Sequence, residues 1–414
     1  MKKKAAITIA LPLVATIMLF DLSATCAGEE PEALHWSADF EQGAASDVHL
    51  REDGAIGFSI PPDPGGDEYL WFCLYVVTEG RKGLEFVLEN AAGAHQTGHR
   101  WNITRPVFST DGRNWIRAAE TSYAKDAGLA RLFGQPVFRF RSPLAADTLW
   151  VAYSYPYTLS DLQLFLNRIK DRPDVAISTL GKSEEGRDIL KVEIEGRADS
   201  AAEPLRRIWI VGREHPGETP LSFVCEGMIQ ALLDHPAGRR MRDAYGFSII
   251  PILNVDGVAH GYYYHNAQGV NLARDWADFR SAEVRLVRDA LAQDAGGNAL
   301  RLVINLHSSN DPDKGHFFLR MAEDKLRPAD AEFQRAIFQA ADKNHPQMQG
   351  CSPVTLYDLP GITGNALYRD FGVYCLYLES NYSRGADGTT VTPESLHDTG
   401  AALVQALAEV LRPE

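Results

Sequence analysis

The sequence predicts two domains: an all-β antiparallel sandwich, followed by an α/β domain whose mixed sheet has helices on both faces. Three observations support this prediction. The chain has 414 residues, which is enough for two ordinary domains with separate cores. Its first part consists of short aromatic and β-branched runs separated by turn signals. From residue 156 onward, strand-like runs alternate with helical ones. We expect the sandwich in residues 28–155 and the α/β domain in residues 156–414, after a signal peptide in residues 1–27.

The first 27 residues are typical of a secretory signal peptide. Three lysines at positions 2–4 precede an apolar run from Ala5 to Phe20, and small residues surround the expected cleavage site. The run is shorter than the ~20 residues that span a bilayer comfortably. A retained N-terminal anchor is the alternative. No later segment is apolar enough to cross a membrane, so we expect an exported protein, periplasmic or secreted, with no membrane span in the mature chain.

Composition and charge narrow the possible partners. Hydrophobic residues make up 45% of the chain and charged residues 23%, as in ordinary soluble globular proteins. The chain has 55 acidic and 41 basic residues, which gives a net charge of −14. Such a chain repels phosphate backbones. We therefore expect no nucleic-acid partner.

The sandwich is predicted from strand-like runs and the turns between them. Tyr69–Val77 and Gly83–Leu88 are rich in aromatic and β-branched residues, and no helical periodicity of useful length precedes Leu159. The turn signals are Pro61-Pro62, Gly65-Gly66, Asp111-Gly112 and Ser142-Pro143. Short strands at this spacing are typical of an antiparallel sandwich of about 120 residues.

The α/β domain is predicted from the alternation that follows. Ser160 is the expected N-cap of a first helix. Several later runs are continuously apolar, as buried central strands require. In chain order, the expected elements are a helix at 161–170, a strand at 207–211, a helix at 221–233, strands at 247–253 and 302–306, a helix at 330–343, a strand at 374–378 and a closing helix within 392–411.

Three of these strands end in polar residues that a buried strand does not otherwise need. His215 and Glu218 follow the strand at 207–211, His307 follows the strand at 302–306, and Glu379 follows the strand at 374–378. In open α/β sheets, the carboxyl ends of the strands form the ligand crevice. We therefore expect these side chains to converge.

The pattern of His215, Glu218 and His307 predicts a site for one zinc ion. His215 and Glu218 are three residues apart on a tight turn, and His307 would arrive from a neighbouring strand. Two histidines and one glutamate leave a fourth position open for water, which is a catalytic zinc arrangement. A His-x-x-Glu pair alone also occurs on solvated turns. The buried strand before it and the Pro216-Gly217 insert favour a site.

Several motifs in order resemble the zinc carboxypeptidase (funnelin) family, and specifically a bacterial exported member of its cytosolic carboxypeptidase-like branch. The run His215–Pro220 followed by a helix carries most of the resemblance. The match covers nearly the whole mature chain. The further matching segments are Tyr69–Val77, Arg105–Trp115, Tyr153–Tyr157, Gly181–Arg187, Asn254–Gly257, Gly269–Arg274 and the strand ends at His307 and Glu379.

The resemblance implies a carboxypeptidase-like α/β fold and a role for each site residue. Zinc would be held by His215, Glu218 and His307. Glu379 would be the general base, which takes a proton from the attacking water and passes one to the leaving amine. Arg274 would grip the terminal carboxylate of the substrate. A structural ion pair for Glu379 and a surface salt bridge for Arg274 are the alternatives.

Three positions near Arg274 depart from the family pattern. Ala273 replaces an asparagine, so half of the usual carboxylate clamp is missing. Tyr264 stands where the branch commonly places an oxyanion-stabilising arginine. Tyr264 or its neighbours Tyr263 and His265 can donate only one neutral hydrogen bond to substrate, because none of them is a fixed cation. Losing one oxyanion donor costs about 2.7–4 kcal/mol. Asn271 replaces an aspartate that orients the first zinc histidine, although its amide carbonyl can still accept that N–H.

The loop Gly361–Asn365 resembles a pocket loop that carries an arginine for acidic side chains in deglutamylating relatives. Asn365 removes that cation, so an acidic residue at the end of the substrate is not expected, although Asn365 itself can contact substrate. Tyr357, on the approach to this loop, is either a substrate hydrogen-bond partner or a packed loop aromatic. His95, in a Gly-rich loop of the sandwich, is not expected to belong to the site.

The function predicted from the sequence is zinc-dependent hydrolysis of a C-terminal peptide bond, with Glu379 as general base. One alternative is a zinc amidase or deacylase that acts on a small N-acyl or cell-wall-derived substrate, which Ala273 and Tyr264 favour. Another is a catalytically weakened binding protein. In each case the expected partner is a peptide or small amide. The sequence defines neither the oligomeric state nor the role of the sandwich.

Overall fold

The structure is a computed structural model that describes residues 34–95, 98–125, 135–196, 206–297, 299–349 and 353–411. The predicted signal peptide, residues 1–27, lies outside these ranges. Within them, no helix is both long enough and apolar enough to cross a membrane.

The N-terminal domain is a β-sandwich with a core of aromatic side chains. Phe58, Phe72, Phe86 and Phe140 are buried and pack on one another with ring centroids 5.2–6.2 Å apart. The described residues form two five-stranded sheets. One contains β1 (Trp36–Ser37), β4 (Cys73–Val77), β10 (Thr148–Ala152), β6 (Val107–Ser109) and β7 (Ile116–Arg117), and the other β2 (Ser46–Leu50), β3 (Ile56–Ser59), β5 (Glu85–Leu88), β9 (Pro136–Arg141) and β8 (Thr121–Lys125).

The prediction of a wholly antiparallel sandwich was wrong in one place. Strands β3 and β5 pair in parallel, with Ile56 opposite Phe86. Between them the chain crosses to the other sheet to form β4 and then returns, so β5 runs in the same direction as β3. Two short 3₁₀ helices, η1 (Ala91–Gly93) and η2 (Gly98–Asn102), follow β5.

The α/β domain contains a mixed sheet, as predicted. The four strands at its centre are parallel, and antiparallel pairs flank them. In spatial order the described strands of this sheet are β11 (Val175–Lys182), β12 (Asp188–Ile194), β14 (Tyr245–Ile250), β13 (Arg206–Gly212), β15 (Leu300–Ser309), β18 (Cys375–Asn381), β16 (Phe317–Arg320) and β17 (Val354–Thr355).

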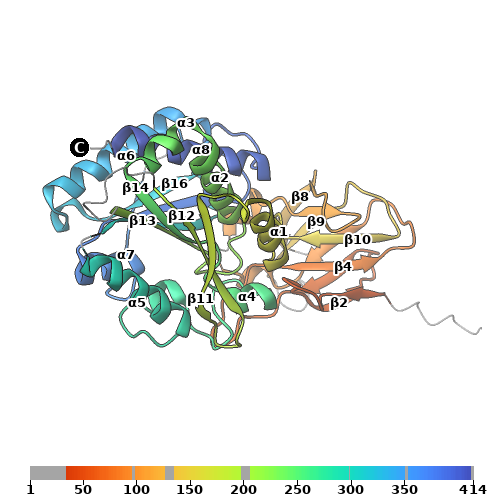
Figure 1. The fold of residues 1–414 in the computed structure, drawn as a ribbon. Helices are drawn as coiled ribbons and strands as arrows, with labels where there is room; N and C mark the ends of the chain where they lie inside the picture. The colour runs from red at the N-terminus through yellow and green to blue at the C-terminus, as the bar shows by residue number, and fades with distance from the viewer. Residues whose placement is uncertain are drawn as a thin grey trace, which may run out of the picture. The chain divides into compact units, whose positions relative to one another are not determined.

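Helices cover both faces of this sheet, also as predicted. In Figure 1, α2, α3, α6 and α8 lie on one face, and α5 and α7 lie on the other. The helices are α1 (Leu159–Ile169), α2 (Pro220–Asp234), α3 (Pro236–Arg242), α4 (Val255–His260), α5 (Ala282–Gly296), α6 (Pro328–Asn344), α7 (Thr363–Phe371) and α8 (Pro393–Val410), with 3₁₀ turns η4 (Leu272–Arg274), η5 (Glu323–Lys325) and η6 (Pro346–Met348).

Helix α1 begins earlier than predicted because Thr158, rather than Ser160, is its N-cap. The Thr158 hydroxyl accepts the backbone N–H of Asp161, and the Asp161 carboxylate accepts the backbone N–H of Thr158. This reciprocal capping box satisfies two N–H groups at the helix start. The Ser160 hydroxyl instead donates to Glu41, in the sandwich.

The register of the central strands determines where the polar strand ends meet. Strands β15 and β18 are parallel, with His307 directly opposite Glu379. Strand β13 lies on the other side of β15 and ends at Gly212, opposite Leu306. The carboxyl ends of three neighbouring strands therefore lie at one edge of the sheet, which confirms the expected convergence.

A buried carboxyl group near this edge makes stability depend on pH. Glu283, at the start of α5, is fully buried, and its carboxyl accepts hydrogen bonds from its own backbone N–H and, at 3.4–3.5 Å, from the Asn266 amide. Burial, with the charges of Glu184 and Asp256, raises the pKa of Glu283 to about 7. In the unfolded chain a glutamate titrates near ~4.3. Folding therefore takes up a proton between these two pH values, and stability falls as pH rises through this window.

We expect Glu283→Gln to increase the free energy of unfolding at pH 8 by about 1–3 kcal/mol, because the amide never has to be desolvated as a charge. At pH 4.5, where the carboxyl is protonated in the folded protein, the gain should be small. Urea denaturation of both proteins at pH 4.5, 6 and 8 measures this difference. A gain that is the same at every pH would contradict the assignment.

Candidate active site

The site is built on a rigid turn, residues 213–218, that follows β13. Arg213 is buried and has a left-handed backbone, with φ of 58°. Its guanidinium donates to the carbonyl of Pro216, at 3.0 Å from Nε, and to the hydroxyl of Ser222, at 2.9 Å from Nη1. Burial lowers the pKa of Arg213 to about 10, so it remains charged at neutral pH. These contacts hold the turn in the shape that directs His215 and Glu218 inward.

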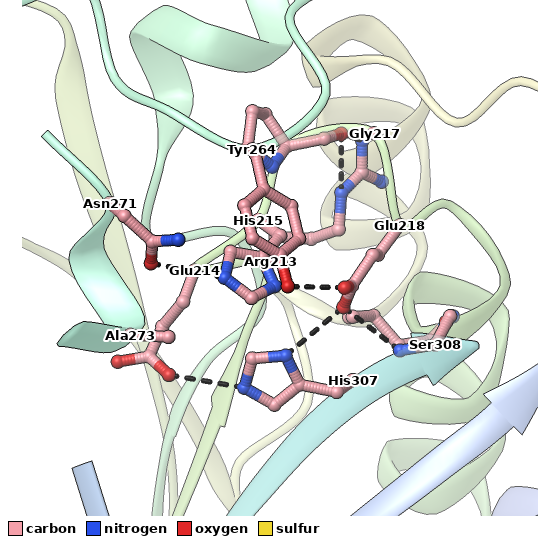
Figure 2. A network of polar contacts seen from close by, with 12 residues as sticks. Arg213, Glu214, His215, Gly217, Glu218, Tyr264, Asn271, Ala273, His307 and Ser308 are labelled. Atoms are coloured by element: carbon pink, nitrogen blue, oxygen red, sulfur yellow. Dashed lines mark hydrogen bonds and ion pairs between the residues drawn. The ribbon is translucent and has the colours of Figure 1, made fainter. Parts of the chain in front are cut away.

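The structure brings the three predicted metal ligands together. His215 Nδ1 lies 2.8 Å from Glu218 Oε1, and His307 Nδ1 lies 3.1 Å from Glu218 Oε2. The side chains converge in Figure 2, and candidate ligand atoms of all three lie within 4.8 Å of one another. Each residue is at most 4% exposed. A turn and a neighbouring strand thus supply one compact His-Glu-His group.

The outer nitrogen of each histidine faces an oxygen acceptor. His215 Nε2 lies 3.1 Å from Asn271 Oδ1, which is the contact predicted for this amide. His307 Nε2 lies 3.2 Å from Glu214 Oε2. Metal-binding histidines typically donate their second N–H in this way, which fixes the tautomer and the ring orientation.

The donor set fits a zinc ion. With the outer nitrogens protonated, the inner nitrogens present lone pairs to the Glu218 carboxylate, and such acceptors repel unless a proton or a cation lies between them. Zinc binds nitrogen and oxygen ligands at about 2.0–2.2 Å, so atoms roughly 3 Å apart can share one ion. Burial alone would lower the pKa of His307, but Glu218 and Glu214 raise it well above its ordinary value. A bound positive charge, either a proton or a metal cation, therefore stabilises this site.

Glu214 is a site residue that the sequence analysis missed. Its carboxylate is fully buried and holds His307 in place. It also accepts hydrogen bonds from Trp276 Nε1 at 2.9 Å, Asn305 Nδ2 at 2.7 Å and the Thr363 hydroxyl at 2.9 Å. An acidic residue directly after an apolar strand was the available signal, because buried carboxylates need partners.

Glu379 lies beside the group with a carboxylate that no described residue pairs with. Neither a hydrogen bond nor an ion pair to its side chain occurs within the described ranges, so the structural ion pair considered as an alternative is not found there. Burial and the charge of Glu218 raise the pKa of Glu379 to about 8, against the opposing charges of His307 and Arg100. Glu218 itself stays ionised, since His215 and His307 outweigh the effect of burial and lower its pKa to about 2.

Tyr264 lies against this group, and Arg274 lies near enough to Tyr264 for its charge to act on it. The Tyr264 ring stacks on the His215 imidazole, with centroids 3.9 Å apart and planes 14° apart. Burial raises the pKa of Tyr264, and the nearby charge of Arg274 partly opposes that rise. Arg274 is exposed and forms no salt bridge with any described residue. Its guanidinium is therefore accessible to an anionic ligand.

Of the other two predicted substrate contacts, Tyr357 lies in the loop before α7 and Asn365 lies in the first turn of α7. Asn365 Nδ2 donates to the carbonyls of Tyr357 and Leu359, at 2.8 and 3.0 Å. Its amide donors therefore hold the loop itself. The Tyr357 side chain is 72% exposed, so it is not the packed aromatic that we considered as an alternative.

The sandwich also reaches the site, which the sequence analysis did not predict. The His95 ring lies 4.6 Å from the Tyr264 ring, and the charge of Arg100 acts on Glu379. The carboxylate of Asp63 binds the backbone around Tyr264. These residues lie more than 100 positions from the ligands in sequence, and no motif marks them.

Comparison with known families agrees with this geometry. A family model described as zinc carboxypeptidase matches residues 162–368, and one described as the cytosolic carboxypeptidase N-terminal domain matches residues 36–154. The chain belongs to the zinc carboxypeptidase family, and it carries the N-terminal domain of the cytosolic carboxypeptidases.

Two cytosolic carboxypeptidases are similar to this chain over much of its length. Human cytosolic carboxypeptidase 6 is 33% identical over 328 residues, which cover 76% of this chain and 64% of that protein. The mouse protein of the same name is 32% identical over 254 residues, which cover 59% and 46%. The chain thus spans less than two thirds of the length of these relatives.

Solved structures share the fold. A metallo-carboxypeptidase from Burkholderia cenocepacia superposes with a TM-score of 0.79 at 24% identity, covering 91% of this chain and 98% of that one. A metallo-carboxypeptidase from Pseudomonas aeruginosa, in complex with (2-guanidinoethylmercapto)succinic acid, gives a TM-score of 0.77 at 21% identity, with coverages of 91% and 99%.

We expect Glu214→Gln to weaken zinc binding about 10- to 100-fold, as is usual when the partner of a metal-binding histidine is lost. In this variant the new side-chain NH₂ group would face hydrogen-bond donors, because every described partner of Glu214 donates to its carboxylate. Competition with a chromophoric chelator measures the affinity. Glu226→Gln is the matched control, because Glu226 is a buried carboxylate that accepts from the Tyr157 hydroxyl instead. Equal affinity in the two variants would exclude this role for Glu214.

Proposed function

We propose that this protein is a zinc metallocarboxypeptidase that hydrolyses the C-terminal peptide bond of its substrate. The observation that carries the proposal is the convergence of His215, Glu218 and His307 beside a carboxylate, Glu379, that no described residue pairs with. His215, Glu218 and His307 would hold the zinc ion. Zinc bound there supplies a Lewis acid that lowers the pKa of a coordinated water to about 7.

Glu379 is suited to move the protons of the reaction. In this proposal it takes a proton from the water that attacks the scissile carbonyl, and it returns a proton to the nitrogen of the leaving amine. A general base works best when its pKa lies near the working pH, and burial beside Glu218 raises the pKa of Glu379 in that direction. The raised pKa of Tyr264 keeps its hydroxyl protonated, so it can donate one hydrogen bond to the substrate carbonyl.

Arg274 would bind the terminal carboxylate of the substrate. Its planar guanidinium presents paired N–H donors that match a carboxylate. Ala273, beside it, is buried and has no polar side-chain atom, so it adds no second donor. Of these two neighbours, only Arg274 could therefore bind a free C-terminal carboxylate.

A second candidate function follows from the missing second donor at Ala273. A zinc amidase or deacylase acting on a small N-acyl or cell-wall-derived substrate has no need for a complete carboxylate clamp, and Ala273 favours it for this reason. A weakened binding protein is less well supported, because all three ligand side chains and Glu379 converge in one site. Zinc binding without turnover of any peptide or amide would favour the binding protein.

Export is also part of the proposal. It is supported by the lysines at positions 2–4, the apolar run that follows and the small residues near Ala27. In an exported protein the substrate would be a peptide outside the cytoplasm.

We expect Glu379→Gln to lower kcat for peptide hydrolysis by about 10²- to 10⁴-fold while the zinc content stays at one ion per chain, because the amide cannot accept a proton. Metal analysis and steady-state kinetics on the same preparations measure both quantities. Glu226→Gln again serves as the buried-carboxylate control and should keep normal kcat. Undiminished activity in Glu379→Gln would remove this residue from the mechanism.

We expect Arg274→Ala to raise KM about 10- to 100-fold for peptides with a free C-terminal carboxylate, since a hydrogen bond to a charged group contributes about 1.5–3 kcal/mol. The same peptides with amidated C-termini should be poor substrates and insensitive to the change. Arg280→Ala is the control, because Arg280 pairs with Asp275 in the same part of the chain. Efficient cleavage of amidated or N-acyl substrates by the unmodified protein would support the amidase instead.

A further inference from the structure

One carboxylate of the sandwich binds the loop that covers the metal site. Asp63 is 5% exposed, and Oδ1 accepts the backbone N–H of Tyr263 at 2.9 Å. Oδ2 accepts the backbone N–H groups of Tyr264 at 2.6 Å and His265 at 3.0 Å. Three consecutive N–H groups thus converge on one anion, which is an arrangement that stabilises both the charge and the loop conformation.

The two domains also meet backbone to backbone beside this carboxylate. Gly65 and Gly269 both have positive φ, at 74° and 73°. A Cβ atom on Gly65 would lie 2.9 Å from Gly269 Cα, so neither position has room for a side chain. Gly269 stands two residues before Asn271, the residue that contacts His215 Nε2. The sandwich therefore supports the covering loop, residues 263–271, at both of its ends.

Two ring contacts in a row connect the sandwich to the first histidine of the site. The centroid of the His95 ring lies 4.6 Å from that of the Tyr264 ring, with the planes tilted by 37°, and the Tyr264 ring stacks on the His215 ring with centroids 3.9 Å apart. Figure 2 shows Tyr264 over His215, with Asn271 on the outer side of the imidazole. The backbone N–H of His95 donates to the carbonyl of Tyr69 at 2.8 Å, which ties its own loop to the sandwich.

Three groups consequently fix the imidazole of His215. Glu218 contacts Nδ1, Asn271 contacts Nε2, and Tyr264 covers one face of the ring. Asn271 and Tyr264 both belong to the covering loop that the sandwich holds.

We propose that the sandwich completes the metal site, with Asp63 and His95 as positioning residues that hold Tyr264 and Asn271 against His215 and thereby set the zinc affinity. This inference rests on the proposed zinc site, and it assigns the N-terminal domain a role in metal binding. Neither residue touches substrate or metal in this account. Both act through the covering loop.

The decisive experiment measures zinc affinity of the full-length chain by chelator competition. We expect Asp63→Asn to bind zinc about tenfold more weakly, because the amide puts an NH₂ group against backbone N–H donors. His95→Ala should lose a similar factor, and His95→Phe should recover most of it, because phenylalanine retains the ring that packs on Tyr264. The visible spectrum of the Co²⁺-substituted proteins provides a second readout of ligand geometry.

The matched controls lie in the same sandwich. Asp111 also accepts backbone N–H groups, those of Arg113 and Asn114, but in a turn of its own domain. His49 is an exposed sandwich histidine whose Nδ1 contacts the carbonyl of Asp47. Asp111→Asn and His49→Ala should bind zinc like the unmodified protein.

A mutant cycle tests the route through Tyr264. In a Tyr264→Ala background the ring contacts with His95 and His215 are lost, so His95→Ala should have no further effect on zinc affinity. A full additional loss in that background would overturn the proposal, as would unmodified affinity in both Asp63→Asn and His95→Ala. If Asp63→Asn fails to fold, as judged by circular dichroism, the comparison of His95→Ala with His95→Phe still decides the question.

These outcomes are distinct from those that test the proposed function. An unmodified protein that binds zinc but hydrolyses neither peptides nor amides would contradict the enzyme and leave the positioning role intact. Hydrolysis that survives Asp63→Asn and His95→Ala with normal zinc affinity would contradict only the positioning role.

Discussion

The site depends on one electrostatic constraint: the ionised carboxylate of Glu218 lies between two imidazole nitrogens at 2.8 and 3.1 Å. Neither nitrogen can turn away, because Asn271 and Glu214 hold the opposite sides of the rings. The protein has thus fixed three electron-pair donors around one point, at a cost in burial that only a positive charge can offset. The stiff turn built around Arg213 and the parallel register of β15 with β18 both serve this arrangement.

Much of the fold and of the metal site could be predicted from the sequence, because both follow from local patterns. Strand runs that end in His215, His307 and Glu379 indicated the sheet edge, and turn residues marked the sandwich strands. Glu214 was missed because its partners, Trp276, Asn305 and Thr363, lie 62 to 149 residues away. Asp63 bonds residues 200 positions distant, and nothing near it in sequence announces that pairing. Short-range patterns determine elements, whereas such contacts depend on how the elements pack.

The two smaller errors in the fold have the same origin. Ser160 is a good N-cap by residue type, yet Thr158 prevails because Asp161 completes a reciprocal pair of hydrogen bonds with it. The direction of β5 relative to β3 depends on the chain crossing to the opposite sheet in between, which periodicity does not reveal. In both cases the competing arrangements are locally equivalent, and the deciding interaction lies in the third dimension.

The contact of Gly65 with Gly269 limits how the two domains can change over time. A methyl group at either position would force the backbones apart and shift the loop segment that leads to Asn271. A substitution of either glycine would therefore require a compensating change in the facing loop. The facing loops of the sandwich and the α/β domain therefore have to change together. In a chimera with a different sandwich, Asn271 would hold His215 less firmly unless both glycines were kept.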